Sequence, residues 1–177
     1  MICLVNDMNY INSVNELRGA TFSAMRFVRG YGIINDRFDL SFKCKDGKVI
    51  LEIETNIRIR DDESVLLAFN DLYLDKSRHE ISIRRYRSQT GIEKTYLSKC
   101  VEQTNMLLNK QIIENIMIFY YGDIIIKFKN GILIEIFNDT HKEGAVLYRY
   151  RKEFLSGKTD NFELSIENNK CKCFFKE

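Results

Sequence analysis

Apolar and polar residues alternate along most of this chain, most clearly in two segments that each contain a turn dipeptide. Residues 40–53 surround Asp46-Gly47, and residues 124–136 surround Asn130-Gly131. Alternation on both sides of Asp-Gly or Asn-Gly is typical of a β-hairpin. The chain is therefore expected to contain a related hairpin twice.

The two hairpins are expected to differ in their turns. In the first, a two-residue turn at Asp46-Gly47 keeps the apolar residues on one face. The pairs this predicts are Cys44 with Val49, Phe42 with Leu51, and Leu40 with Ile53.

A two-residue turn in the second hairpin would place Ile126 opposite Glu135. A three-residue loop over residues 129–131 avoids this, and it predicts a left-handed Gly131. The pairs are then Phe128 with Ile132, Ile126 with Ile134, and Ile124 with Ile136.

The rest of the chain is also rich in strand patterns. In residues 49–60 the odd positions are mostly apolar and most even ones charged, which predicts one long strand with a charged face. A terminal hairpin over residues 161–176 pairs Phe162, Leu164 and Ile166 with Phe175, Cys173 and Cys171. Further strands are expected at 21–28, 65–69, 112–120 and 145–150, and a short helix or turn at 9–17.

One segment, residues 93–109, has the spacing of a longer amphipathic helix, which we expect to cover a sheet face. Its apolar stripe contains Tyr96, Leu97, Cys100, Val101, Leu107 and Leu108.

These elements predict an α+β fold, mainly antiparallel, in a single domain spanning residues 1–177. Two related halves, residues 17–75 and 112–150, flank the helix, and the hairpin at 161–176 follows. The pattern does not distinguish a sandwich from a partly closed barrel. Apolar residues make up 45% and charged residues 29% of the chain, which suits a folded domain.

Charge and targeting signals restrict the partners. The formal net charge of +2 supplies no general attraction to nucleic acid or anionic lipid. No apolar run approaches the roughly 18 residues that span a bilayer. The first residues lack the pattern of a secretory signal, so a cytoplasmic location is expected.

Candidate catalytic and metal-binding residues are weakly supported. The five cysteines are odd in number and lack a C-x-x-C pair, so neither a disulfide framework nor a zinc site is predicted. Most are expected to be buried small apolar residues. Cys100 falls on the helix stripe, and His79 and His141 stand alone in polar contexts.

Carboxylates offer the best acid–base hypothesis. Glu52 and Glu54 share a strand face, and Glu135 occupies the matching position of the second hairpin. A solvated face offset by Arg58 and Arg60 explains them more simply. Residues 61–63, Asp-Asp-Glu, are interpreted as a charged loop. We assign no catalytic, cofactor-binding or metal-binding residue, and expect no cofactor.

Two clusters form a candidate interaction surface. A basic run with an interleaved tyrosine can contact phosphate or an acidic protein, and tyrosine and arginine are enriched at binding hot spots. The residues are Arg84, Arg85, Tyr86 and Arg87, together with Tyr120, Tyr121, Tyr148 and Arg149.

Several short motifs resemble an uncharacterised bacterial protein family, a domain of unknown function, from about residue 17 onward. The chain has Ile57 and Tyr148 where that family usually has Trp. The matching motifs are Leu17-Arg18-Gly19, Asn56-Ile57-Arg58-Ile59, Asp71-Leu72-Tyr73, Gly122-Asp123-Ile124, Asn130-Gly131, Ile134-Glu135-Ile136-Phe137 and Tyr148-Arg149-Tyr150.

Proteins of this kind are similar in size and style to immunity proteins, which bind and neutralise a toxin. The resemblance implies a non-enzymatic cytoplasmic domain that binds another protein. Two alternatives remain: nucleic-acid binding through residues 84–87, and a small-molecule-binding protein or hydrolase with an unrecognised site.

Overall fold

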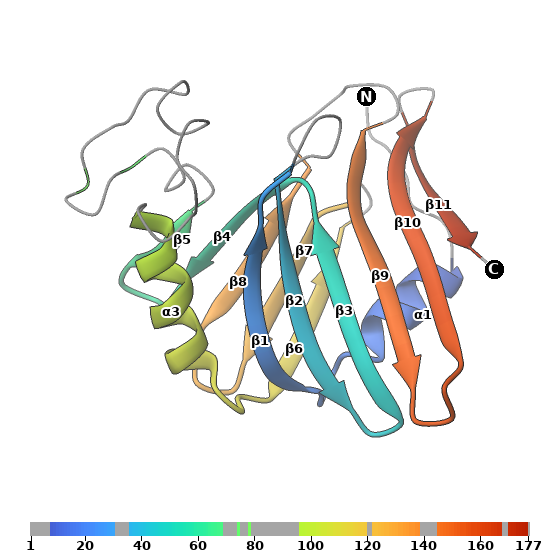
Figure 1. The fold of residues 1–177 in the computed structure, drawn as a ribbon, viewed down its shortest axis with the longest axis horizontal. Coiled ribbons are helices and arrows are strands. Elements are labelled where there is room, and N and C mark those ends of the chain that lie inside the picture. The colour runs from blue at the N-terminus through green and yellow to red at the C-terminus, as the bar shows by residue number, and fades with distance from the viewer. Residues whose placement is uncertain are drawn as a thin grey trace.

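Two antiparallel β-sheets face each other in the computed structural model (Figure 1), which describes residues 8–30, 36–68, 74, 78, 96–119, 122–138, 145–167 and 170–176. The predicted α+β class is confirmed. In order across the six-stranded sheet lie β1 (Thr21–Val28), β2 (Arg37–Cys44), β3 (Gly47–Ile53), β9 (Val146–Phe154), β10 (Thr159–Glu167) and β11 (Lys170–Lys176).

The five-stranded sheet packs behind the first. Its order is β5 (Val65–Ala68), β4 (Asn56–Arg60), β8 (Leu133–Phe137), β7 (Ile124–Phe128) and β6 (Ile113–Ile118). The two predicted hairpins therefore lie in different sheets, β2–β3 in one and β7–β8 in the other. Helix α3 (Tyr96–Leu108) lies beside β1 and β5, and helix α1 (Met8–Asn15) contacts β6 (Figure 1).

The predicted single strand over residues 49–60 is wrong. It breaks at Glu54-Thr55, where β3 ends in one sheet and β4 begins in the other. Both strands keep their apolar residues toward the same interior, so the alternation continues through the corner and cannot reveal it. Hydrogen bonds hold the corner: Glu54 N–H to Leu147 C=O (3.0 Å), and the Thr55 hydroxyl to Phe137 C=O.

A seam between β1 and β6 closes one side of the sandwich. Gly19 N–H donates to Ile113 C=O and Ile113 N–H to Ala20 C=O, both at 2.9 Å. Phe22 N–H then donates to Gln111 C=O at 2.8 Å. The architecture is a sandwich that is partly closed into a barrel along this seam.

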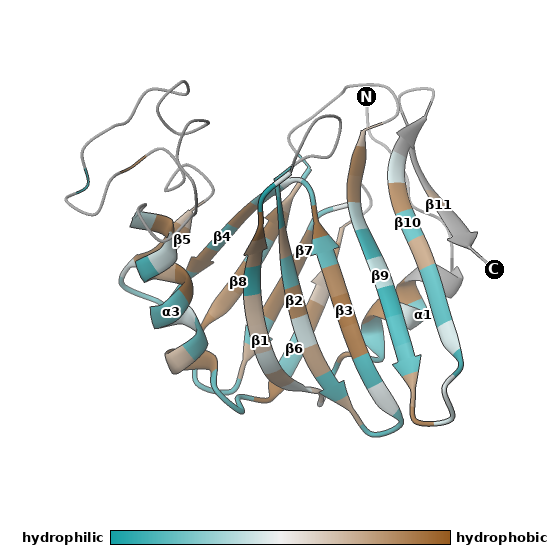
Figure 2. Ribbon diagram, viewed as in Figure 1, coloured by the Kyte–Doolittle hydropathy of each residue, from teal (hydrophilic) through white to brown (hydrophobic). Residues whose placement is uncertain are grey.

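The core lies between the two sheets. Phe22 packs edge-on against Phe42 of its own sheet and Phe128 of the other, with ring centroids 6.0 Å apart in both pairs. Hydropathy alternates in bands along strands such as β10 (Figure 2), as a sheet with one buried face requires. The largest fully buried side chains are Tyr148, Tyr150, Phe22, Phe38, Phe42 and Phe128.

The second and third hairpins have their predicted registers. Phe128 N–H donates to Ile132 C=O across the three-residue loop, and Gly131 is left-handed with φ of 87°. The remaining pairs also match the prediction: Ile126 with Ile134, Ile124 with Ile136, Phe162 with Phe175, Leu164 with Cys173, and Ile166 with Cys171.

The first hairpin is shifted by one residue in its turn. The turn residues are Lys45-Asp46, and Gly47 begins β3 opposite Cys44. A Cβ on Gly47 would collide with the carbonyl oxygen of Glu153 and lie 2.9 Å from Phe154 Cα. Gly47 is therefore explained by the close approach of β9 rather than by turn conformation. The actual pairs are Phe42 with Val49, Leu40 with Leu51, and Phe38 with Ile53.

The predicted helix is confirmed over Tyr96–Leu108, and residues 93–95 lie outside the described part. Its stripe needs one correction, because Leu107 is 47% exposed whereas Thr104 is buried. Spacings of three and four from Leu97 reach Cys100, Thr104 and Leu108 and leave Leu107 to one side. On the same helix, the Asn105 amide accepts from Met25 N–H (2.7 Å) and donates to Met25 C=O (3.0 Å).

Candidate functional site

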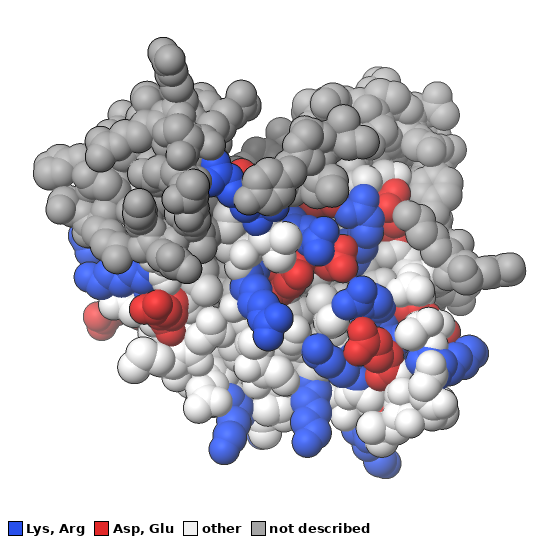
Figure 3. Space-filling model, viewed as in Figure 1, with Lys and Arg blue, Asp and Glu red and all other residues white. Residues whose placement is uncertain are grey.

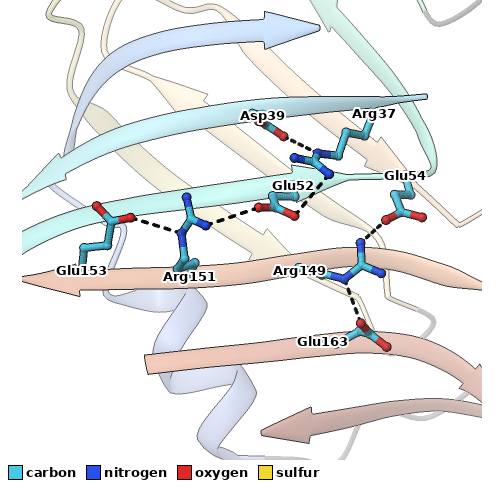
Figure 4. Close-up of polar contacts among 8 residues, drawn as sticks. All are labelled: Arg37, Asp39, Glu52, Glu54, Arg149, Arg151, Glu153 and Glu163. Atoms are coloured by element: carbon cyan, nitrogen blue, oxygen red, sulfur yellow. Dashed lines mark hydrogen bonds and ion pairs between the residues drawn. The ribbon is translucent and has the colours of Figure 1, made fainter. Parts of the chain in front are cut away.

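Ion pairs cover much of the outer face of the six-stranded sheet (Figures 3 and 4). We call this network the arginine ladder. In its first part, Arg149 Nε lies 2.8 Å from Glu163, and its Nη1 contacts Glu54, whose side chain is only 7% exposed. Burial acts to lower the pKa of Arg149, but the bonds to Glu54 and Glu163 outweigh it and raise that pKa.

The second part of the ladder joins β2, β3 and β9. Arg37 Nε binds Asp39 at 2.9 Å, and its Nη1 lies 3.9 Å from Glu52. Glu52 also lies 3.8 Å from Arg151, which contacts Glu153 at 3.2 Å. Every arginine of the ladder thus has at least one carboxylate beside it, as Figure 4 shows.

The outer face of the other sheet holds a separate cluster. Glu135 is 4% exposed and accepts from Arg58 Nε at 2.6 Å and from Arg60 Nε at 3.0 Å. The Arg58 guanidinium also lies 5.0 Å from the centroid of the Phe137 ring. The expectation that Arg58 and Arg60 offset Glu52 is therefore wrong. Because Glu52 lies on β3 and Glu135 on β8 of the other sheet, these two carboxylates do not form an acid–base pair.

Three cavities surround the Lys45-Asp46 turn, and we call this region the turn end. One of about 620 Å³ includes Asp46, Tyr150, Lys152 and Asp160 in its lining, and one of about 370 Å³ shares Asp46 and Lys152 with it. The third, of about 810 Å³, lies toward the seam between β1 and β6. Segments far apart in sequence therefore meet at the turn end.

Lys152 is the central side chain of the turn end. It points inward from β9, its side chain is 8% exposed, and its Nζ lies 2.7 Å from Glu16 and 2.8 Å from Asp46. The same Nζ lies 4.5 Å from the centroid of the Phe154 ring, a cation–π distance. One ammonium group thus ties the segment after α1 to the β2–β3 turn.

Four ionisable groups at the turn end have shifted pKa values, and each shift points away from neutral pH. Burial acts to lower the pKa of Lys152, but hydrogen bonds to Asp46 and Glu16 raise it overall. The hydrogen bond from Lys152 lowers the pKa of Asp46. Burial raises the pKa of the Cys44 thiol and of the Tyr150 phenol. None of these groups is shifted toward the neutral range that proton transfer in catalysis requires.

The cavity of about 810 Å³ is basic, and we call it the lysine groove. Its charged lining residues are Lys43, Lys45 and Lys110, and no described lining residue is acidic. Three neutral lining residues, Thr21, Ser23 and Asn109, carry hydrogen-bond donors.

The interaction surface predicted from sequence is only partly visible. Tyr148 is 0% exposed in the core, so its prediction as a contact residue is wrong. Its position in β9 alternates inward, and the aromatic side chain fills the space between the sheets. Arg149 remains on the surface at 33% exposure, but it is engaged in the ladder. The others lie outside the described residues: Arg84, Arg85, Tyr86, Arg87, Tyr120 and Tyr121.

Other candidate chemistry is accounted for by structure. Cys100 is buried on α3. Asp61 accepts from the backbone N–H groups of Glu63 (2.9 Å) and Ser64 (2.7 Å), which closes the β4–β5 turn. His79 and His141 lie outside the described residues.

Within the described residues, no group of His, Cys, Asp and Glu side chains is arranged to hold a metal ion. Likewise, neither described helix is long and apolar enough to cross a membrane. Lys152 was not predicted from the sequence, because it stands between Arg151 and Glu153 in a charged segment and its inward position is set by the strand.

Comparisons with known proteins add no relative: no family model, curated protein or solved structure matches this chain.

Proposed function

We propose that the protein is a cytoplasmic binding domain of the immunity type, which recognises a partner protein, a toxin, through the turn end. The observation that supports this most directly is the meeting of three cavities around one turn. A hollowed surface of mixed apolar and charged character, built on strands, suits the recognition of another molecule.

Binding explains the turn end better than catalysis does. A nucleophilic cysteine needs a lowered pKa, and a nucleophilic lysine must lose its proton. Burial raises the pKa of Cys44 instead, and two carboxylates keep Lys152 protonated. The same groups supply fixed charges and hydrogen-bonding atoms, which are the requirements of recognition.

An apolar anchor stands at the rim of the turn end. Leu155 follows β9 directly and is 85% exposed. Its N–H donates to Asp46 C=O at 3.0 Å, so the β9–β10 turn is tied to the β2–β3 turn. Burying this side chain against a partner would remove apolar area from water, worth about 1.5–3 kcal/mol for a full leucine.

The immunity part of the proposal is supported by the sequence resemblance described above and by the compact, mainly antiparallel fold. The partner of an immunity protein is encoded beside it. The first experiment is therefore co-expression of this protein with the product of the adjacent gene. Growth restored by co-expression supports the proposal, and toxicity that persists contradicts it.

The binding surface is tested with a matched pair of variants. Leu155→Glu places a charge at the turn end, and Met106→Glu does the same on α3, where Met106 is 77% exposed. We expect the wild type and Met106→Glu to capture the partner equally, and Leu155→Glu to bind at least about tenfold more weakly. Equal binding by all three would remove the turn end from the interface.

A further inference from the structure

The lysine groove gathers three unneutralised positive charges in one cavity. Lys43, Lys45 and Lys110 line it, and none of them forms an ion pair with a described residue. All three side chains belong to exposed residues. Figure 3 shows basic side chains along the lower edge of the molecule, where the β2–β3 turn lies, and mixed charges higher on the same face.

The fold places like charges against each other here. Lys43 on β2 is directly opposite Lys48 on β3. Like charges at opposed positions of an antiparallel pair are unfavourable, by roughly 0.2–1 kcal/mol relative to neutral residues. On its other side Lys48 lies opposite Glu153 of β9, whereas Lys43 lies opposite the neutral Thr21 of β1. Lys43 therefore has no acidic residue directly opposite it on either neighbouring strand, which leaves its charge available for binding.

Hydrogen-bond donors complete the groove. Thr21 of β1 pairs in register with Lys43, and Ser23 occupies a β-bulge two residues further on. Asn109 and Lys110 enter from the end of α3, where Lys110 is left-handed with φ of 58°. Hydroxyl, amide and ammonium groups from three elements therefore converge on one concave surface. Such a set of donors is complementary to anionic oxygen atoms.

We infer that the lysine groove holds an acidic segment of the partner protein, with Asp or Glu carboxylates against the ammonium groups of Lys43, Lys45 and Lys110. This inference rests on the proposed function, and it specifies the chemistry of the partner. Complementary charge would speed association and exclude partners without an acidic segment.

Carboxylates fit the groove better than a nucleic-acid backbone does. A phosphate backbone is recognised by basic residues spread along a track, and affinity grows with the number of phosphates neutralised. The three groove lysines instead surround one cavity, and the neighbouring ladder presents Glu52, Glu153 and other carboxylates on the same sheet face. Those carboxylates would repel a backbone that extended along the sheet.

The test uses fluorescein-labelled hexaglutamate as the probe and fluorescence anisotropy as the readout, with the full chain. The groove variant is Lys43→Gln/Lys45→Gln. Its control, Lys99→Gln/Lys127→Gln, changes the net charge equally at two exposed lysines, on α3 and β7, that line none of the three cavities of the turn end. We expect the groove variant to raise the Kd of the probe at least about fivefold and the control to change it less than twofold.

Three outcomes would overturn the inference: equal weakening in both double variants, absence of hexaglutamate binding to the wild type, or tighter binding of a single-stranded oligonucleotide of equal charge. The variants must keep the wild-type melting temperature within a few degrees for the comparison to count, and exposed lysines meet this condition.

Failure of this inference is distinguishable from failure of the proposed function. In one outcome, Leu155→Glu loses capture of the partner and Lys43→Gln/Lys45→Gln retains it. This would keep the proposed function and overturn the inference that an acidic segment binds in the lysine groove. Loss of hexaglutamate binding in the groove variant, with no partner captured by any variant, would keep the chemistry of the groove and remove the proposed function.

Discussion

The arginine ladder and the lysine groove share one sheet but use charge in opposite ways. In the ladder, Arg37, Arg149 and Arg151 each lie within 4 Å of a carboxylate, and several of the carboxylates are largely buried. In the groove, Lys43 and Lys45 stand exposed with no described ion-pair partner. The two regions are only a few residues apart along β2 and β3.

Chemistry explains which residue type stands in which region. The planar guanidinium of arginine binds two carboxylates at once, so it suits a network that crosses several strands. The ammonium of lysine is a strongly hydrated point charge on a flexible stem, which suits a surface that stays in water until a partner arrives. The comparison teaches that charges paired within the fold contribute to stability, whereas unpaired ones are available for recognition.

The largest effect on stability is expected at Gly47, where β3, which carries Lys48, pairs with β9, which carries Arg149. The methyl group that Gly47→Ala introduces would overlap the backbone carbonyl oxygen of Glu153. We expect a loss of about 3 kcal/mol in the free energy of unfolding, measured by urea denaturation. The control is Gly131→Ala, which meets nothing but must hold φ of 87°, and which should cost about 1 kcal/mol. An equal cost at both positions would contradict the close approach of β9.

The next effect concerns the ladder itself. Arg149→Ala removes the guanidinium beside Glu54, whose side chain is 7% exposed, and beside Glu163. Because a largely buried carboxylate loses its counter-charge, we expect a loss of about 2 kcal/mol. Arg149→Lys should recover part of it. A change below about 0.5 kcal/mol in Arg149→Ala would place the ladder among ordinary surface ion pairs.

A smaller, pH-dependent effect is expected at Lys152, which belongs to neither region and is paired with Glu16 and Asp46. Its bond lowers the pKa of Asp46 below the usual 3.8, so this contribution is complete above that value and is lost as pH falls through the shifted pKa. The pKa of Lys152 is raised above 10.5, so its own contribution is complete below that value and is lost as pH rises through the shifted pKa.

Melting temperature measured from pH 2 to pH 12 tests both limits. Asp46 is largely exposed, so solvent screening holds its contribution below about 1 kcal/mol. Asp46→Asn should reduce the fall in melting temperature at acid pH. Lys152→Met should reduce the fall at both acid and alkaline pH. A pH profile in Lys152→Met that superimposes on the wild type would contradict the assignment.

The smallest effect, and the one with opposite sign, is expected in the groove. Lys43→Gln relieves the repulsion between Lys43 and Lys48 across β2 and β3, so we expect a gain of about 0.3 kcal/mol at low salt. Since salt screens exposed charges, the gain should vanish near 1 M NaCl. A loss of stability in Lys43→Gln would show that this lysine has a stabilising partner and would end the contrast with the ladder.

The sequence predicted features that depend on neighbouring residues. Gly131 and its alternating flanks determine one hairpin completely, because the loop and both strands lie within a short segment. Gly47 is flanked by an equally regular alternation. Its role is nevertheless set by the close approach of β9, which lies about a hundred residues later in the chain. Local alternation could not reveal that contact, and the turn was therefore placed one residue too late.

The candidate site was harder to predict because its parts come from distant segments. Glu52 and Glu135 have the same local pattern, but their arginine neighbours are set by sheet order, which the pattern does not contain. Tyr148 was expected on a surface, although alternation along β9 directs it into the core. Lys152 shares that inward face and became visible as a central group only when Glu16 and Asp46 were found beside it.

The amide of Asn105 also has a consequence for how molecules of this protein meet at high concentration. An exposed edge strand is a template on which another chain can add its own strand and begin aggregation. On β1 the side chain of Asn105 occupies both hydrogen-bonding groups of Met25, and the seam with β6 occupies the start of the strand. This edge of the sheet therefore offers no continuous template, and one side-chain amide limits polymerisation at β1.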